Sequence, residues 1–397
     1  MSTIKFTDGS IQFRLRIITS LLTQRPILIT NIRSTSLTSP GLSTSEASFL
    51  HLIDKITNGS KIEINTTGTQ LKFHPGILLG SSASSTNGMM MYEHTCEGGR
   101  SIGWFFEGIL PLLPFGKEGF SIVFYGITDG KSLEDPSIDY FQYTLPPILS
   151  RFGISSDDLD YNFSIKILNR GGCPDGGGKV KISCPIINSS SSPNSKSLHS
   201  IDWTDEGKIK RVRGYAISCR MNPTSSARLA HATKGLCLKL LPDVWIHTDV
   251  HSASNKKNVG GGCGPNPSLG VCLYTQSTTD VILCAETSLD INIKKNNKRQ
   301  LPEDLGQYGA ALLLQEVQKG GVVDTAQQTL VLLWMCLTSE DVSRVRLGTL
   351  SPYTIQSLRL FKLMFGVEYK VRCEDDTKTV LLSCLGTGYR NLARAST

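Results

Sequence analysis

A glycine cluster is one feature of the sequence that could do chemistry. The stretch NRGGCPDGGGKVKISCP, residues 169–185, places Gly176, Gly177 and Gly178 directly before an alternating strand pattern. Glycines permit positive φ and close backbone approach, so the cluster suits a tight turn, or a loop whose amides face an anion. The residues alone leave both interpretations open.

A basic run could bind RNA or another acidic partner. The segment GKIKRVRG, residues 207–214, contains Lys208, Lys210, Arg211 and Arg213. If it forms a strand, Arg211 and Arg213 share one face. Strand edges are often charged simply to prevent aggregation, so a solvated edge is the alternative. The pattern supports binding of RNA or an acidic protein segment as strongly as it supports a solvated edge.

Cysteine and histidine are the remaining residue types with metal or nucleophilic chemistry. The chain has 11 cysteines, no CxxC pair, and most cysteines lie in apolar runs such as WMCL and VILCAE. Buried free thiols of a reducing compartment explain this pattern better than disulfides or zinc. We expect no metal site.

The overall composition is that of a soluble globular protein. The 397 residues carry a net charge of +7, no apolar run reaches the length of a membrane span, and the N-terminus lacks the apolar core of a secretory signal. Residues 188–299 contain 15 Lys and Arg against 8 Asp and Glu, so the excess positive charge lies in this one segment. Such a surface favours an acidic partner such as RNA.

The elements that must position these residues follow a repeated pattern. Residues 47–59, 140–153 and 353–366 each predict an amphipathic helix ending at a glycine, and alternating strands follow each helix. Another helix and strand precede each unit, within residues 13–33, 103–128 and 310–350. We therefore predict an α/β (α+β) fold in which three tandem two-helix, small-sheet repeats form one body.

The spacing of the glycines indicates an insertion. Gly59 and Gly153 are 94 residues apart, whereas Gly153 and Gly366 are 213 apart. We therefore divide the chain into repeats one and two (1–187), a smaller, basic α/β insert (188–299) and a third repeat (300–397). Ser- and Asn-rich tracts at the insert's ends are typical of linkers.

This organisation resembles the RNA 3′-terminal phosphate cyclase superfamily. The resemblance rests on RGGCPDGGGKVKISCP and, for the eukaryotic cyclase-like branch, on SFLHLIDKITNGSKIEI, FHPGILLGS, EGKIKRVRGYA, LPEDLGQYGA and LSPYTIQSLRLFKLMFG. Both branches share the PDGGGKV turn, so the resemblance favours a structural turn at Gly176–Gly178.

The resemblance implies that cyclase chemistry is absent. Cyclases carry AMP on a histidine in the third repeat, where this chain has GGVVDTAQQTL with Asp324 at that position and no histidine after residue 299. Their N-terminal glycine-rich nucleotide loop corresponds here to TDGSIQFRLR, with bulky Ile11 and Phe13. We expect no catalytic residue, a vestigial position at Asp324, and no cofactor.

Four further basic residues are candidate anion ligands. Arg14 matches an arginine common to the superfamily, and Arg33 lies close to it in sequence. Arg14 and Arg16 cannot share a helix face, so we expect Arg14 to face the cleft and Arg16 to face solvent. A surface ion pair is an equal alternative for Arg14. Arg359 and Lys362, spaced i and i+3, share a face, and simple solvation is their alternative.

The resemblance implies a role in ribosome assembly. We expect a nuclear, nucleolar component of the small-subunit processome, needed for early pre-rRNA cleavage and for maturation of the small ribosomal subunit. Its partners would be pre-rRNA, processome components and a large ribosome-assembly GTPase, with no membrane. The rival functions are an endoribonuclease that cuts pre-rRNA and a residual cyclase.

Overall fold

Three sheets of the computed structural model repeat one topology. The structure describes residues 3–79, 91–117, 119–130, 135–154, 163–185, 198–251, 262–289, 301–374 and 376–390. Each repeat contains a strand, a helix, a parallel strand, a second helix and an antiparallel pair. The first comprises β1 (Ile4–Phe6), α1 (Phe13–Thr23), β2 (Ile27–Ile29), α2 (Thr44–Ile56), β4 (Lys61–Ile64) and β5 (Leu71–His74).

The second and third repeats keep this order of elements. The second comprises β7 (Tyr92–Thr95), α3 (Ile102–Ile109), the 3₁₀ helix η1 (Leu110–Phe115), β8 (Phe120–Gly126), α4 (Ile138–Arg151), β9 (Ser164–Arg170) and β10 (Gly178–Cys184). The third comprises β11 (Asp202–Trp203), α7 (Gln328–Leu337), β17 (Val342–Leu347), α8 (Pro352–Phe365), β18 (Lys370–Glu374) and β19 (Thr379–Leu385). The strand orders β1-β2-β5-β4, β7-β8-β10-β9 and β11-β17-β19-β18 correspond one to one.

Local capping explains where the second helix of each repeat begins and ends. Ser43 and Glu46 form a capping box at α2, while Ser137 and Ser351 cap α4 and α8 through their hydroxyls. Gly153 and Gly366 follow α4 and α8 with positive φ, as the glycine stops predict. The first repeat differs, because α2 ends at Ile56 and the pair β3 (Thr57–Asn58) and β6 (Ile77–Leu78) follows it.

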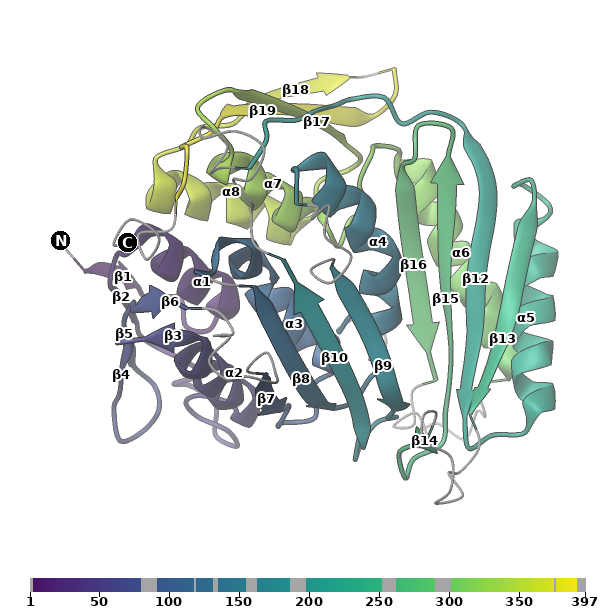
Figure 1. Cartoon of the computed structure of the whole chain (residues 1–397), viewed down its shortest axis with the longest axis horizontal. Coiled ribbons are helices and arrows are strands. Elements are labelled where there is room, and N and C mark those ends of the chain that lie inside the picture. The colour runs from purple at the N-terminus through teal and green to yellow at the C-terminus, as the bar shows by residue number, and fades with distance from the viewer. Residues whose placement is uncertain are drawn as a thin grey trace, which may run out of the picture.

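The insert is a four-stranded sheet with two helices on one face. It comprises β12 (Ile209–Cys219), α5 (Pro223–Cys237), β13 (Val244–His251), β15 (Ser268–Ser277), β16 (Ile282–Ser288) and α6 (Pro302–Lys319), in the strand order β13-β12-β15-β16. Figure 1 shows both helices on the side of this sheet away from the body. The short β14 (Gly262–Cys263) leaves the insert and extends the second repeat's sheet beside β9.

The predicted domain boundaries at 187/188 and 299/300 lie outside the described residues. Two described segments nevertheless pack with a different part of the molecule from the one that their sequence positions predict. The strand β11 pairs with β17 and so opens the third repeat, although its sequence position is within the predicted insert. The helix α6, assigned by its sequence to the third repeat, packs on α5, β15 and β16. By packing, the insert therefore runs from Ile209 to Lys319, between β11 and α7.

Two hydrophobic cores account for the stability of the molecule. One cluster of buried side chains runs through all three repeats, with Phe49, Phe105, Phe141 and Trp334 among its largest members. A smaller cluster joins the insert sheet to α5 and α6. The predicted mixed α/β class is confirmed. Among the described helices, none is long and apolar enough to cross a membrane.

Candidate functional site: an acidic cavity between body and insert

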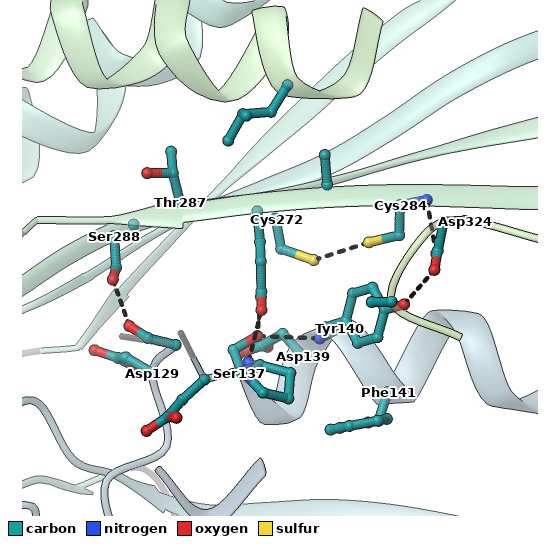
Figure 2. A pocket seen from close by; sticks show the side chains of 18 of the residues that line it. Asp129, Ser137, Asp139, Tyr140, Phe141, Cys272, Cys284, Thr287, Ser288 and Asp324 are labelled. Carbon is teal, nitrogen blue, oxygen red and sulfur yellow. Dashed lines mark hydrogen bonds between the residues drawn. The ribbon is translucent and has the colours of Figure 1, made fainter. Parts of the chain in front are cut away.

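A cavity of about 600 Å³ lies where α4, the insert sheet and the loop before α7 meet. Its lining includes seven carboxyl side chains, those of Glu107, Asp129, Asp135, Asp139, Glu286, Glu316 and Asp324. Arg14 is the single lysine or arginine among the described lining residues. Figure 2 shows Asp324 and Tyr140 at one end of this space and Asp129 and Ser288 at the other.

Asp324 is buried at the cavity wall, with 3% of its surface exposed. The Tyr140 hydroxyl donates to its Oδ1 at 2.6 Å, and the backbone amides of Gln327 and Cys284 donate at 3.1 and 3.3 Å. Burial raises its pKa to about 7 despite these donors. Asp324 therefore links the loop before α7 to α4 and β16.

Glu286 reaches from β16 to the start of α4. Its carboxylate accepts hydrogen bonds from the backbone amide of Ser137, at 2.7 Å, and from the Ser137 hydroxyl. A helix N-terminus favours a negative charge at this place. Burial nevertheless dominates and raises the pKa of Glu286 to about 7. Near neutral pH this carboxyl is thus partly protonated.

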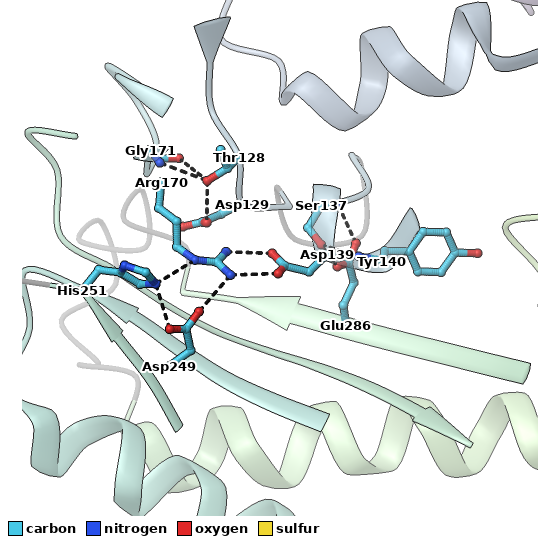
Figure 3. A network of polar contacts seen from close by, with 10 residues as sticks. All are labelled: Thr128, Asp129, Ser137, Asp139, Tyr140, Arg170, Gly171, Asp249, His251 and Glu286. Atoms are coloured by element: carbon cyan, nitrogen blue, oxygen red, sulfur yellow. Dashed lines mark hydrogen bonds and ion pairs between the residues drawn. The ribbon is translucent and has the colours of Figure 1, made fainter. Parts of the chain in front are cut away.

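A buried guanidinium lies behind the cavity wall, where it pairs with Asp139. Arg170, at the end of β9, forms a two-pronged pair with Asp139 of α4 at 2.8 and 2.9 Å. It also contacts Asp249 at 2.9 Å and His251 Nε2 at 3.1 Å, both on β13 (Figure 3). The His251 ring in turn lies 2.8 Å from Asp249. This cluster fastens the insert to the second repeat.

Arg14 lines the cavity but is already paired. Its guanidinium bonds Glu107 at 2.7 Å and the carbonyl of Trp104, and lies 4.3 Å from the Trp104 ring centroid. At the start of α1, the Gln12 side chain does not cap the helix and instead donates to the Ser357 hydroxyl at 2.7 Å and to the Tyr353 carbonyl at 3.2 Å. A phosphate cradle at a helix start needs free amides with little side chain in the way.

Comparison with known proteins identifies the family of the chain. Residues 6–371 match the profile of the family described as RNA 3′-terminal phosphate cyclase. The chain belongs to the RNA 3′-terminal phosphate cyclase family. The mouse protein named RNA 3′-terminal phosphate cyclase-like protein is 42% identical to it, and the match covers 96% of this chain and 95% of the mouse protein.

Two other relatives in the family span almost the full length of the chain. A Dictyostelium discoideum protein named probable RNA 3′-terminal phosphate cyclase-like protein is 41% identical over 99% of this chain and 100% of its own. The Schizosaccharomyces pombe protein named rRNA processing protein rcl1 is 33% identical over 96% of this chain and 94% of its own.

The other basic residues expected on the body do not line the cavity. Arg33 pairs with Glu46 and donates to the Gly41 carbonyl at 2.8 Å, so it fixes the start of α2. Arg359 and Lys362 are both exposed on α8, where Lys362 pairs with Glu368 at 2.7 Å. Neither lines the cavity. Arg14 and Arg33 are therefore engaged within the chain, and an anion would have to displace their partners.

The expectation that Arg16 faces solvent is wrong. Its side chain is 5% exposed and pairs with Asp8 at 2.6 Å. The guanidinium also lies 4.2 Å from the centroid of the Phe6 ring. Helical spacing separates Arg14 from Arg16 correctly, but a carboxylate outside the helix draws Arg16 inward.

The basic run begins just before β12 and continues into it, at the far side of the insert. Arg211 and Arg213 share a strand face, where Arg211 donates to Gln276 at 2.7 Å and Arg213 pairs with Asp243 at 2.7 Å. Lys208 and Lys210 are exposed. None of the four lines the cavity. The cavity and the basic run are thus separate surfaces.

The glycine cluster packs backbone against backbone. Gly176 and Gly177 have φ of 69° and 80°. A Cβ on Gly176 would lie 2.8 Å from the carbonyl carbon of Gly126, and one on Gly178 would lie 2.6 Å from the Thr128 methyl carbon. The turn is therefore filled by protein atoms, which leaves little room for an anion at these carbons.

Sequence reasoning missed Glu286, Ser137 and Tyr140, which line the cavity, and Arg170, which pairs with Asp139 of its wall. Ser137 and Glu286 meet although they are 149 residues apart, and Tyr140 and Asp324 are 184 apart. One local signal was available, because SIDY places a serine three residues before Tyr140, the spacing of an N-cap. Nothing local indicates the partner across the cavity.

Proposed function

We propose that the chain is a non-cyclase rRNA-processing factor of the small-subunit processome. In this proposal it works in the nucleolus, binds pre-rRNA and a large ribosome-assembly GTPase, and is needed for early pre-rRNA cleavages. The family membership and the printed name of the S. pombe relative support the rRNA-processing role. The GTPase, the processome and the nucleolar location come from the resemblance of the sequence alone.

The lack of an unpaired cation among the described lining residues of the cavity is the observation that carries the non-cyclase part. Adenylate transfer from ATP requires a nucleophile and positive groups to hold phosphates. The described lining offers seven carboxyls and one arginine, which Glu107 already neutralises. By the resemblance of the sequence, Asp324 stands at the position of the histidine nucleophile, and three donors hold its carboxyl. Among the described lining residues, a triphosphate entering this space would find no unpaired cation.

Binding, rather than chemistry, is therefore the proposed role of the chain. Carboxyls with a raised pKa could in principle serve as general acids and bases. Here Asp324 and Glu286 join α4 to the insert and the third repeat, so their hydrogen bonds hold the domains together. These structural hydrogen bonds account for the burial of both carboxyls, so no substrate is needed to explain it.

Two measurements test the proposal. Fission-yeast cells depleted of rcl1 should recover early pre-rRNA cleavage when this chain is expressed, as read by RNA blots of the precursors. Purified protein should also leave labelled pre-rRNA fragments intact, both alone and with the GTPase. Failure of the complementation contradicts the rRNA-processing role. Cleavage by the protein alone would instead establish the endoribonuclease alternative.

A further inference from the structure

One face of the insert sheet is left open over β12 and β13. Alternate residues of β12 point to opposite faces, and Val212, Gly214 and Ala216 are buried on the side of α5. On the other face α4 packs against β16 and β15. Among the described elements, β12 and α5 pack along β13, and Arg170 of β9 contacts Asp249 and His251 near its C-terminal end. Figure 1 shows β13 at the outer end of the molecule.

Aromatic rings occupy this open face. Trp245 on β13 is 57% exposed, and His247 on the same face is also exposed. The His247 ring lies 5.6 Å from that of Tyr215, its direct neighbour on β12. Tyr143 of α4 stacks nearly parallel to Tyr215 at 5.4 Å, with 8° between the ring planes. The rings of Tyr143, Tyr215 and His247 therefore form a row from α4 to the outermost strand, where Trp245 lies two residues before His247.

The second feature of the face is unneutralised positive charge beside the rings. Arg211 is held by the neutral amide of Gln276, so its charge is not cancelled. Lys208 and Lys210 are exposed and make no ion pair with any described residue. The Lys234 amine lies 5.3 Å from the centre of the Trp245 ring. Only Arg213 in the basic run has a carboxylate partner, Asp243.

We propose that this face, formed by Arg211, Arg213, Tyr215, Trp245 and His247, binds single-stranded RNA. Unpaired bases stack on exposed rings, and arginine and lysine beside the rings contact the phosphates. An exposed tryptophan can also serve a protein partner, so the choice of RNA rests on the combination of several rings on one face with lysines and arginines beside them. The assignment rests on the proposed function, because it names the surface through which the chain contacts pre-rRNA.

The test is equilibrium binding of a fluorescein-labelled, mixed-sequence single-stranded RNA to the full-length chain at several salt concentrations. Trp245→Ala should weaken binding about 5- to 150-fold and leave the salt dependence unchanged, because it removes stacking only. Trp245→Phe, the matched control, should bind close to the wild type. Arg211→Gln should lower the slope of log K against log salt by about 0.7. Lys72→Gln changes the net charge equally, on the first repeat's sheet, and should leave the slope alone.

The outcomes distinguish a failure of this binding surface from a failure of the proposed RNA-binding function. If the wild type binds RNA and both Trp245→Ala and Arg211→Gln bind equally well, this face is not the RNA site, while an RNA-binding role stands. If only the charge variant weakens binding, stacking is absent and the proposal is overturned in favour of an electrostatic patch. If the wild type binds no RNA, both fail. Circular dichroism of Trp245→Ala should match the wild type, since the ring is exposed.

Discussion

Replacing Arg170 by methionine would leave buried carboxylates without their cation. The side chains of Arg170 and Asp139 are 8% and 5% exposed, and their pair is joined by two hydrogen bonds. Removing one partner of a buried pair costs about 3–5 kcal/mol, since the other charge stays buried and unpaired. For a chain of 397 residues unfolding as one unit, this lowers the melting temperature by about 4–6 °C.

Scanning calorimetry and urea unfolding measure this loss, with Arg228→Met as the matched control. Arg228 forms a two-pronged pair with Glu303, but its side chain is 52% exposed, so its loss should cost about 0–1 kcal/mol. Arg170→Met with Asp139→Asn should cost less than the sum of the single changes. Equal losses for Arg170→Met and Arg228→Met would refute the argument that burial makes this cluster a fastener between insert and body.

Three other changes test the cavity and the glycine turn. Incubation with labelled ATP should leave no AMP on the wild type or on Asp324→His, because Arg14, the single cation among the described lining residues, is already paired with Glu107. Acid-labile label on the wild type would contradict the non-cyclase interpretation. Burial raises the pKa of Glu286 from 4.5 to about 7, so the folded state loses stability as pH rises through this window. Above pH 7, Glu286→Gln should therefore have a higher free energy of unfolding in urea than the wild type. Near pH 4 the two free energies should match. Gly264→Ala should destabilise the protein by about 1–3 kcal/mol, because its Cβ would lie 2.0 Å from the Gly176 carbonyl oxygen. Gly235→Ala, in open space on α5, should instead stabilise it by up to about 1 kcal/mol. The opposite order of the two variants in urea midpoints would count against both predictions.

The repeat pattern was predictable because it depends on local signals. Amphipathic helices ended by Gly153 and Gly366 and followed by alternating strands can be recognised within about 30 residues of sequence. The three short leading strands could not be recognised this way. The strand β11 has two residues, Asp202 and Trp203, which is too short for any periodicity. Its membership of the third sheet depends on β17, far along the chain.

The position of α6 shows a second limit of local patterns. Its apolar stripe, with Leu305, Ala310 and Leu313 buried, is the same whichever sheet it packs against. The period of a helix reports that a face is buried, and does not report the partner. The cavity was missed for the same reason, because Glu286 and Ser137 acquire their roles only when the insert docks on α4.

The placement of the insert between β11 and α7 has a consequence for synthesis on the ribosome. β11 ends at Trp203 and its partner β17 begins at Val342, about 140 residues later. At the usual elongation rates of about 5–20 residues per second, β11 waits roughly 7–28 s for its partner to be made. The first two sheets and the insert sheet can all form in that interval, so the third sheet is the last to close.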